Sequence, residues 1–227
     1  MPRPHLHRLA AGLAGAVALT SMAAFGAVGS ASAADTGASV ATKAAPKAKG
    51  VRSLATLLAA DKGFDRNGQD FDIAEAAIML VLEERPKSPV GLVADGKQPL
   101  TVFVPTDLAF KRLVADLTGK HAGTEHQTVR KLTRLVDVKT LETVLLYHVV
   151  TRSLASPYIL DATADRESLT TAIGADIGLR PDRKTVRLVD ADPNDLDPRL
   201  VPELIDINRG NRQVAHGINR VLRPADL

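Results

Sequence analysis

Apolar side chains between residues 53 and 147 recur mainly at the three- and four-residue spacing that is typical of amphipathic helices. A helix is predicted over 73–84, where Asp72 and Glu75 form a start that resembles a capping box. Two prolines end this pattern. Helical spacing returns after the polar stretch 118–128, so this half of the chain is predicted to be mainly helical.

A short run of β-forming residues, 100–104, interrupts the helical pattern and ends at Pro105. The next two residues, Thr106 and Asp107, are of helix-capping types, and a carboxylate there can accept hydrogen bonds from the first N–H groups of a helix. Phe110 opens the apolar face of that helix. The segment therefore predicts a strand–turn–helix unit in which Asp107 acts as a cap.

Beyond Tyr147 the pattern changes to short β-rich runs separated by turns rich in Gly, Pro and Asp. The predicted strands are 149–152, 168–172, 176–179, 185–189, 204–208 and 213–222. Helices early in the chain and strands late in it favour the α+β class over alternating βαβ units.

The first residues have the pattern of a secretory signal peptide. Two arginines precede an apolar stretch rich in Ala and Gly, which ends at the small-residue cleavage site Ala31-Ser32-Ala33. A membrane-spanning helix is the alternative, because about 20 apolar residues can span a bilayer. Composition and cleavage site favour a signal peptide over 1–33, a flexible linker rich in Ala and Lys over 34–52, and one folded domain over 53–227.

Composition and charge exclude several classes of function. The chain has no Cys, which rules out disulfides, thiolate metal sites and Cys nucleophiles, and it has only seven Phe and Tyr and no Trp. Leader and linker hold six of the 29 basic residues and one of the 26 acidic residues, so the remaining chain has a net charge of −2. Nucleic acid is therefore an unlikely partner, and we expect no membrane span after signal cleavage.

Four segments, in the same order and spacing, resemble the fasciclin domain family. Residues 101–110 (TVFVPTDLAF) resemble its first signature segment, and 145–150 (LLYHVV) its Tyr-His segment. Residues 169–179 resemble a strand pair of the family, and 216–224 (HGINRVLRP) its closing segment. The resemblance extends over about 53–227 and is to secreted, single-domain proteins of bacterial type.

The sequence departs from the family pattern in two ways. Arg212-Gln213 stands where the family has Asn-Gly, and Gly217 and Asn219 stand where it has Val and Asp. Three segments are longer than the family norm, namely 64–72, 119–138 and 190–198. Insertions of this kind are usually surface loops, where differences in binding reside.

The resemblance implies a wedge-shaped β-sandwich with packed helices that makes adhesive contacts with a cell-surface, envelope or matrix protein or polymer. It implies a contact role for Tyr147 and His148. The family-motif residues that we expect to be structural are Thr101, Phe103, Pro105, Thr106, Asp107, Phe110 and His216. We expect an extracellular monomer without a cofactor.

Helical spacing places His148 on one face with Leu141 and Val144, which predicts a buried, hydrogen-bonded imidazole beside the contact role that the resemblance implies. In a strand, His216 shares a face with Val214 and Ile218 and is also expected in the core.

Two acidic segments and a pair of histidines have residue types that bind metals. The loop 65–72 offers several oxygen ligands, but its glycine and its glutamate do not have EF-hand spacing, so it is interpreted as a solvated acidic turn. The aspartates of 190–197 are interpreted in the same way. His121 and His126 could share a metal only with a distant third ligand. The sequence thus predicts no metal site.

A secreted hydrolase is the alternative function. The chain lacks the nucleophile-elbow, zinc-protease, P-loop and Ser-x-x-Lys motifs, so a Ser/His/Asp site would have to be assembled in three dimensions. With both motif histidines in the core, His121 and His126 would be the available bases. The prediction is a binding module and not an enzyme.

Overall fold

The computed structural model describes residues 49–60 and 63–226, which belong to one compact unit. The predicted signal peptide and most of the predicted linker lie outside the described residues. Among the described helices, none combines the length and the apolar character needed to cross a bilayer.

Helices and strands are mixed along the chain, which confirms the predicted α+β class. The helices are α1 (Leu54–Leu58), α2 (Asp72–Glu84), α3 (Asp107–Thr118), α4 (Glu125–Leu135), α5 (Val138–Tyr147) and α6 (Ser156–Ala164), with short 3-10 helices η1 (Pro89–Ala94) and η2 (Pro202–Leu204). The strands are β1 (Leu100–Pro105), β2 (Val149–Val150), β3 (Ser168–Thr170), β4 (Asp176–Asp182), β5 (Thr185–Val189) and β6 (Gln213–Ile218).

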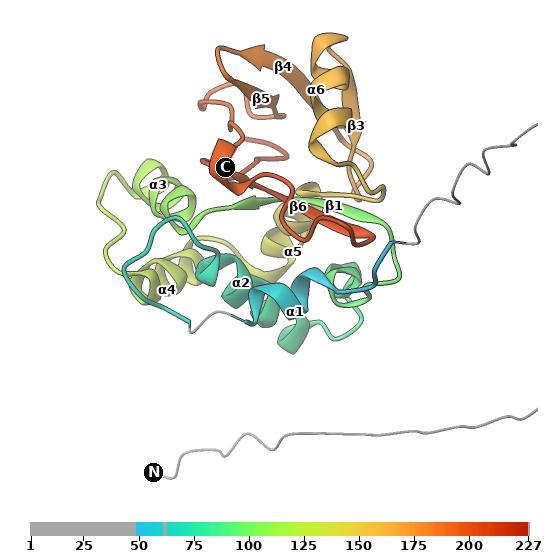
Figure 1. Cartoon of the computed structure of the whole chain (residues 1–227). Helices are drawn as coiled ribbons and strands as arrows, with labels where there is room; N and C mark the ends of the chain where they lie inside the picture. The colour runs from blue at the N-terminus through green and yellow to red at the C-terminus, as the bar shows by residue number, and fades with distance from the viewer. Residues whose placement is uncertain (1–48, 61–62, 227) are drawn as a thin grey trace, which may run out of the picture. The chain divides into compact units, whose positions relative to one another are not determined.

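The strands form two three-stranded sheets. In the first sheet, β1 lies between β2, which is antiparallel to it, and β6, which is parallel to it with Phe103 opposite His216. The second sheet, β3-β4-β5, is antiparallel throughout. Figure 1 shows α1, α2, α4 and α5 on one side of β1 and β6, and the second sheet with α6 on the other. The sandwich arrangement expected from the sequence stays a prediction.

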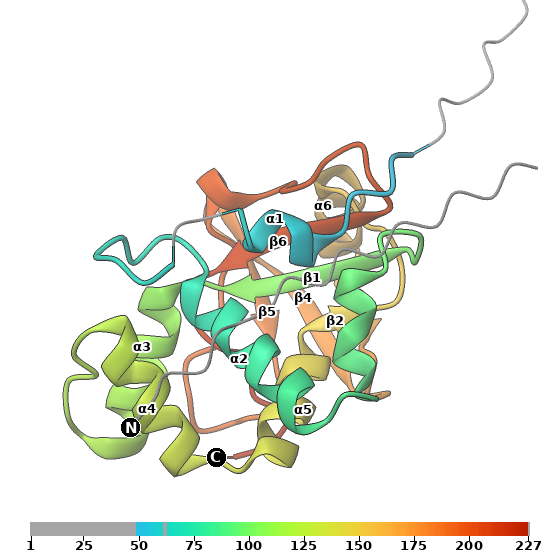
Figure 2. The same ribbon diagram turned by 90° about the horizontal axis from the view of Figure 1, so that it is seen from below.

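Strand β1 is buried along its whole length because both of its faces are covered. Leu100, Val102 and Val104 point into a core shared with the helices, and Figure 2 shows α1, α2 and α5 across this face. Phe103 points the other way, into the core of the second sheet and α6. Two-residue alternation thus distributes one strand between two hydrophobic cores.

The structure adds detail to the predicted elements and corrects one of them. The helical spacing that continues to Tyr147 belongs to two helices, α4 and α5, and α5 starts where Asp137 accepts a hydrogen bond from Thr140 N–H. No strand forms over 204–208, where Asp206 and Asn208 have positive φ angles of 55° and 66° that an extended strand does not allow. Helices η1 and α6 were not predicted.

The capping box predicted for α2 is also absent. Phe71 occupies the N-cap position without a side-chain hydrogen bond, and Asp72 is the first residue of the helix.

Two departures from the family pattern have structural explanations. A side chain at Gly217 would place its Cβ 2.6 Å from Cβ of Leu204, so glycine allows η2 to pack on β6. Asn219 accepts a hydrogen bond from Arg199 N–H at 2.8 Å through its side-chain oxygen. Both residues therefore hold the segment that leads from β5 to β6.

Gln213 fixes the N-terminal helix to β6. Its side chain is fully buried, accepts a hydrogen bond from Leu54 N–H at 2.8 Å, and donates two to the carbonyl oxygens of Leu92 and Asp95 at 2.9 Å each. One amide thus satisfies backbone groups at the start of α1 and around the end of η1.

We predict that Gln213→Ala lowers the free energy of unfolding by about 3 kcal/mol, because it leaves buried backbone groups without partners. Urea unfolding of both proteins measures this difference. The control is Gln98→Ala, which changes an exposed glutamine and is expected to stay within about 0.5 kcal/mol of wild type. An equal effect of the two substitutions would contradict the role assigned to Gln213.

Candidate functional site

The motif residues of β1 all make interior contacts. The Thr101 hydroxyl donates to the carbonyl of Arg152 at 2.6 Å and accepts from Leu154 N–H at 2.8 Å. Phe103 is fully buried, and Phe110 on α3 is 3% exposed. Pro105 ends the strand beside Ile218. These residues hold β1 in place and present no chemistry to solvent.

The turn after β1 starts two helices. Thr106 is the N-cap of α3, as predicted, and accepts a hydrogen bond from Ala109 N–H at 3.3 Å. Asp107 does not cap its own helix, contrary to the prediction. Its Oδ1 accepts from Ile73 N–H of α2 at 2.9 Å, and its backbone N–H donates to the carbonyl of Asp70 at 3.0 Å. The motif turn therefore connects α2 to β1.

His148 is 2% exposed, as its helical spacing predicted. Leu222 N–H donates to Nε2 at 2.9 Å, so the proton lies on Nδ1, which donates to the carbonyl of Val144 at 2.7 Å. Burial lowers the pKa of His148 to about 4, although the Val144 carbonyl opposes this shift. A neutral imidazole thus joins the end of α5 to the C-terminal segment.

Tyr147 and His216 are also inaccessible to a partner in this structure. Both are fully buried. The Tyr147 hydroxyl donates to the carbonyl of Asp176 at 2.9 Å, and burial raises its pKa to about 12. His216 Nε2 lies 2.9 Å from the carbonyl of Leu154, and burial lowers the pKa of its ring. The contact role implied for Tyr147 and His148 stays a prediction.

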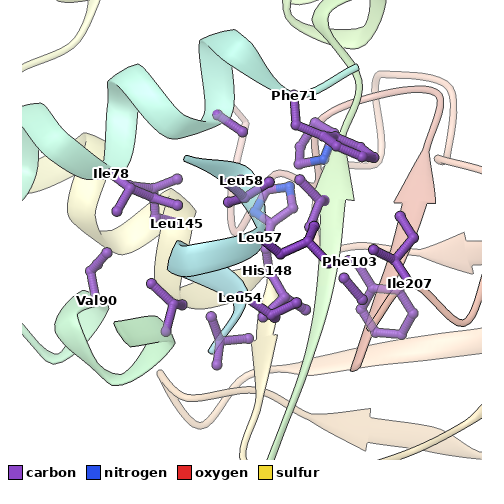
Figure 3. Close-up of a pocket in the computed structure, with 17 residues that line it drawn as sticks. Leu54, Leu57, Leu58, Phe71, Ile78, Val90, Phe103, Leu145, His148 and Ile207 are labelled. Atoms are coloured by element: carbon purple, nitrogen blue, oxygen red, sulfur yellow. The ribbon is translucent and has the colours of Figure 1, made fainter. Parts of the chain in front are cut away.

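A small apolar cavity lies between α1, α2 and the first sheet (Figure 3). Its volume is about 30 Å³, and its walls include Leu57, Phe71, Ile78 and Ile207, with His148 at one side. Small-molecule sites usually have at least about 300 Å³. Both ring nitrogens of His148 are already hydrogen-bonded, so the cavity is a packing gap in the core and not a binding site.

Two of the segments that exceed the family norm lie together on the surface. Asp65 N–H donates to Glu125 Oε2 at 2.7 Å, and the rings of Phe64 and His126 meet edge to face with centroids 5.9 Å apart. Figure 1 shows the loop before α2, in blue-green, beside α3 and α4. Phe64 and Leu108 are 44% and 37% exposed. We call Phe64, Leu108 and His126 the insertion surface.

The carboxylates beneath this surface are buried, so the predicted solvated acidic turn is wrong for two of its members. Asp70 and Asp72 are 9% and 4% exposed, and Asp107 and Glu125 are 0% and 1% exposed. Burial, together with the nearby carboxylates of Asp70 and Glu125, raises the pKa of Asp107 to about 8. Burial likewise raises the pKa of Asp70.

Two overlapping sets of these carboxylates have the spacing of metal ligands. Asp72, Asp107 and Glu125 form one set, and Asp65, Asp70 and Asp72 the other, with the oxygens of each set within 4.8 Å of one another. Neither His121 nor His126 belongs to a metal-sized group in the described part of the chain. Sequence reasoning missed Glu125, because its burial depends on contacts with residues 14 and 60 positions away.

Arginines hold the third long segment, 190–198. The solvated turn that was predicted for its aspartates is therefore wrong. Asp192 is 3% exposed and pairs with Arg223 at 3.2 Å, while Asp195 pairs with Arg223 at 3.0 Å and with Arg220 at 3.2 Å. Burial raises the pKa of Asp190, which accepts Arg223 N–H, to about 6. These ion pairs fix the segment against the C-terminal residues.

Comparison with known proteins identifies the family. The fasciclin domain model matches residues 88–224, more than half of the chain, so this protein belongs to the fasciclin domain family and the predicted resemblance is confirmed. The loop of residues 63–71 and helices α1 and α2 precede the match. No curated protein matches the chain.

One solved structure that the chain resembles is a FAS1 domain pair from the insect cell adhesion molecule fasciclin I. The sequences are 14% identical and the TM-score is 0.42. The alignment covers 70% of this chain and 46% of the other, so this chain spans less than half the length of that protein.

We predict that protonation of His148 destabilises the fold below neutral pH. Its folded pKa, about 4, lies below the ordinary value of 6.5. Between these pH values the unfolded chain binds a proton that the folded chain does not. The contribution of His148 to the free energy of unfolding is therefore complete above pH 6.5 and falls by about 3 kcal/mol towards pH 4.

The measurement is urea unfolding of wild type and His148→Gln between pH 4 and 7.5. The free energy of unfolding is plotted against pH for each protein, and the two plots are compared. The comparison is needed because carboxyl groups with a raised pKa, such as Asp190, make both proteins more stable as the pH falls. The pH dependence is expected to be weaker in His148→Gln and unchanged in the control His121→Gln. Parallel curves for wild type and His148→Gln would contradict this prediction.

Proposed function

We propose that this chain is a secreted adhesion module that binds a protein or polymer of the cell surface, envelope or matrix. Membership of the fasciclin domain family, whose members are generally adhesion or binding modules, supports this proposal. The predicted signal peptide supports an extracellular location.

The observation that carries the proposal is that the family-motif side chains lie in the interior, whereas side chains of the long segments lie on the surface. The aromatic and histidine side chains of the family motifs are engaged inside the fold, whereas the insertion surface places an exposed Phe64 beside His126. Leu108 lies against the same loop, since its N–H donates to the carbonyl of Gly68 at 3.0 Å. We propose that partners contact this surface, and that Tyr147 and His148 act indirectly by supporting the fold.

A hydrolase is less well supported. The two motif histidines have both ring nitrogens occupied by backbone groups, which leaves no nitrogen to act as a base. His121 and His126 are exposed, and within residues 63–226 neither ring is hydrogen-bonded to a serine or to an aspartate. The arrangement required for an activated nucleophile is therefore not preformed around any of these four histidines.

We predict that replacing the exposed rings of the insertion surface weakens adhesion at least tenfold without unfolding the protein. The variant is Phe64→Ser with His126→Ser, and the assay measures the retention of cells and of envelope or matrix fractions on immobilised full-length protein. Melting temperatures check the fold. The control is Leu160→Ser, which removes a 58% exposed side chain from α6.

Retention that is lost in the double variant and kept in the control would support the insertion surface. Equal retention by all three proteins would exclude this surface as the contact. Failure of the wild type to retain any cell or fraction would contradict the adhesion function itself.

We also predict that export removes residues 1–33 and leaves Ala34 as the first residue. Intact-mass measurement of the exported protein tests this directly. Ala33→Asp places a charged residue at the cleavage site, where small residues are required, and is expected to block processing. An exported chain that keeps its first 33 residues would show that the segment is not a cleaved signal.

A further inference from the structure

The carboxylate cluster beneath the insertion surface contains oxygen atoms with no hydrogen-bond partner among the described residues. Asp107 is fully buried, and its Oδ2 lacks a donor, although its Oδ1 caps α2. Asp70 Oδ1 is also buried without a donor. Buried oxygens of this kind are costly unless a proton or a cation satisfies them.

Two contacts offset the charge of Glu125 within this cluster. Lys111 forms an ion pair with Glu125 at 2.7 Å, and Glu125 also accepts Asp65 N–H at 2.7 Å through its second oxygen. Both carboxylate oxygens of Glu125 therefore have a donor. The side chains of Asp70 and Asp107 lie within hydrogen-bonding reach of each other, but two carboxyl groups can share a hydrogen bond only when one of them is protonated.

The spacing of the cluster matches a divalent cation with oxygen ligands. Calcium binds oxygens at 2.3–2.6 Å, so two ligands on the same ion lie at most about 5 Å apart. One oxygen each from Asp72, Asp107 and Glu125 lies within 4.8 Å of the others. The exposed Asp65, which is within the same distance of Asp70 and Asp72, marks the side on which the cluster approaches solvent.

We propose that Asp72, Asp107 and Glu125 bind one calcium ion, which joins the starts of α2, α3 and α4 beneath the insertion surface. Each of the three residues belongs to the first turn of its helix. Helix N-termini favour the carboxylates, and the carboxylates favour the cation. Calcium suits the site better than magnesium, because it accepts irregular sets of protein oxygens and loses its water more readily.

The test uses the full-length chain, treated with a chelator and dialysed at pH 7.5. Titration calorimetry with CaCl2 is expected to show one ion per chain with a dissociation constant between about 10⁻⁴ and 10⁻³ M, the range of extracellular modules. The melting temperature is expected to rise by about 5 °C in 10 mM CaCl2 relative to NaCl of equal ionic strength. MgCl2 is expected to give a smaller rise.

Asp107→Asn is the informative variant because it is nearly isosteric. Its amide oxygen can still accept Ile73 N–H, and its NH2 can donate to Asp70, so the calcium-free variant is expected to melt no lower than calcium-free wild type. Its calcium affinity is expected to fall at least tenfold, as is that of Glu125→Gln. The control Asp161→Asn changes an exposed carboxylate on α6 and is expected to keep wild-type affinity.

Two results would overturn the proposal. If wild type neither binds calcium nor gains melting temperature in CaCl2, the orphan oxygens of Asp70 and Asp107 share a proton instead. If calcium binds but Asp107→Asn keeps full affinity while Asp65→Asn loses it, the ion belongs to the outer set of carboxylates. Neither result depends on whether the insertion surface takes part in adhesion.

Discussion

The burial of β1 on both faces is the constraint on which the rest of this fold depends. A strand in this position needs hydrogen-bonding partners on both edges and apolar cover on both faces. Strands β2 and β6 form hydrogen bonds with the two edges of β1, and the two hydrophobic cores cover its two faces. Because Phe103 and its neighbours Val102 and Val104 face opposite cores, neither core can be repacked without moving the strand that defines the other.

Polar groups inside such a fold must be satisfied locally, and this requirement explains the motif histidines. His148 and His216 each use two ring nitrogens to bind backbone groups at separate points of the chain. A neutral imidazole offers one donor and one acceptor at opposite sides of a rigid ring, which suits a link between two chain segments. The family motifs therefore belong to the internal framework, whereas two of the three long segments meet at the insertion surface.

The sequence predicted those elements whose signal is local. The β1–α3 unit, the body of α2, and strands β4 and β5 were predictable, because alternation, helical spacing and turn residues all lie within the segment itself. Helix α6 was not predicted, since only Ile159, Ala162 and Thr163 of its nine residues are buried and they define a weak pattern. The predicted strand over 204–208 failed because Asp206 and Asn208 adopt left-handed backbone angles that residue type alone did not reveal.

The candidate site was less predictable than the fold because its contacts span long distances in sequence. The acidic character of 65–72 was evident, but the burial of Asp70 and Asp72 was not. The loop that carries them is held by Glu125, which accepts a hydrogen bond from Asp65 N–H, 60 residues earlier in the chain. The capping role of Asp107 was predicted from its type, yet its partner belongs to a helix that starts 35 residues earlier. Residue type indicates which hydrogen bond a side chain can make, and only the tertiary structure determines with which segment.

Two of these long-range contacts join residues before the family match to residues inside it. The match starts at residue 88, but Ile73 N–H is a hydrogen-bond donor to the buried carboxylate of Asp107, which lies inside it. Leu54 N–H likewise donates to the buried Gln213, and Leu54 itself packs in the core beneath β1. A chain that began at residue 88 would leave both buried groups without these partners and expose one face of the central strand. Because unpaired buried groups and exposed apolar surface are costly, α1 and α2 stabilise the segment that the family model matches.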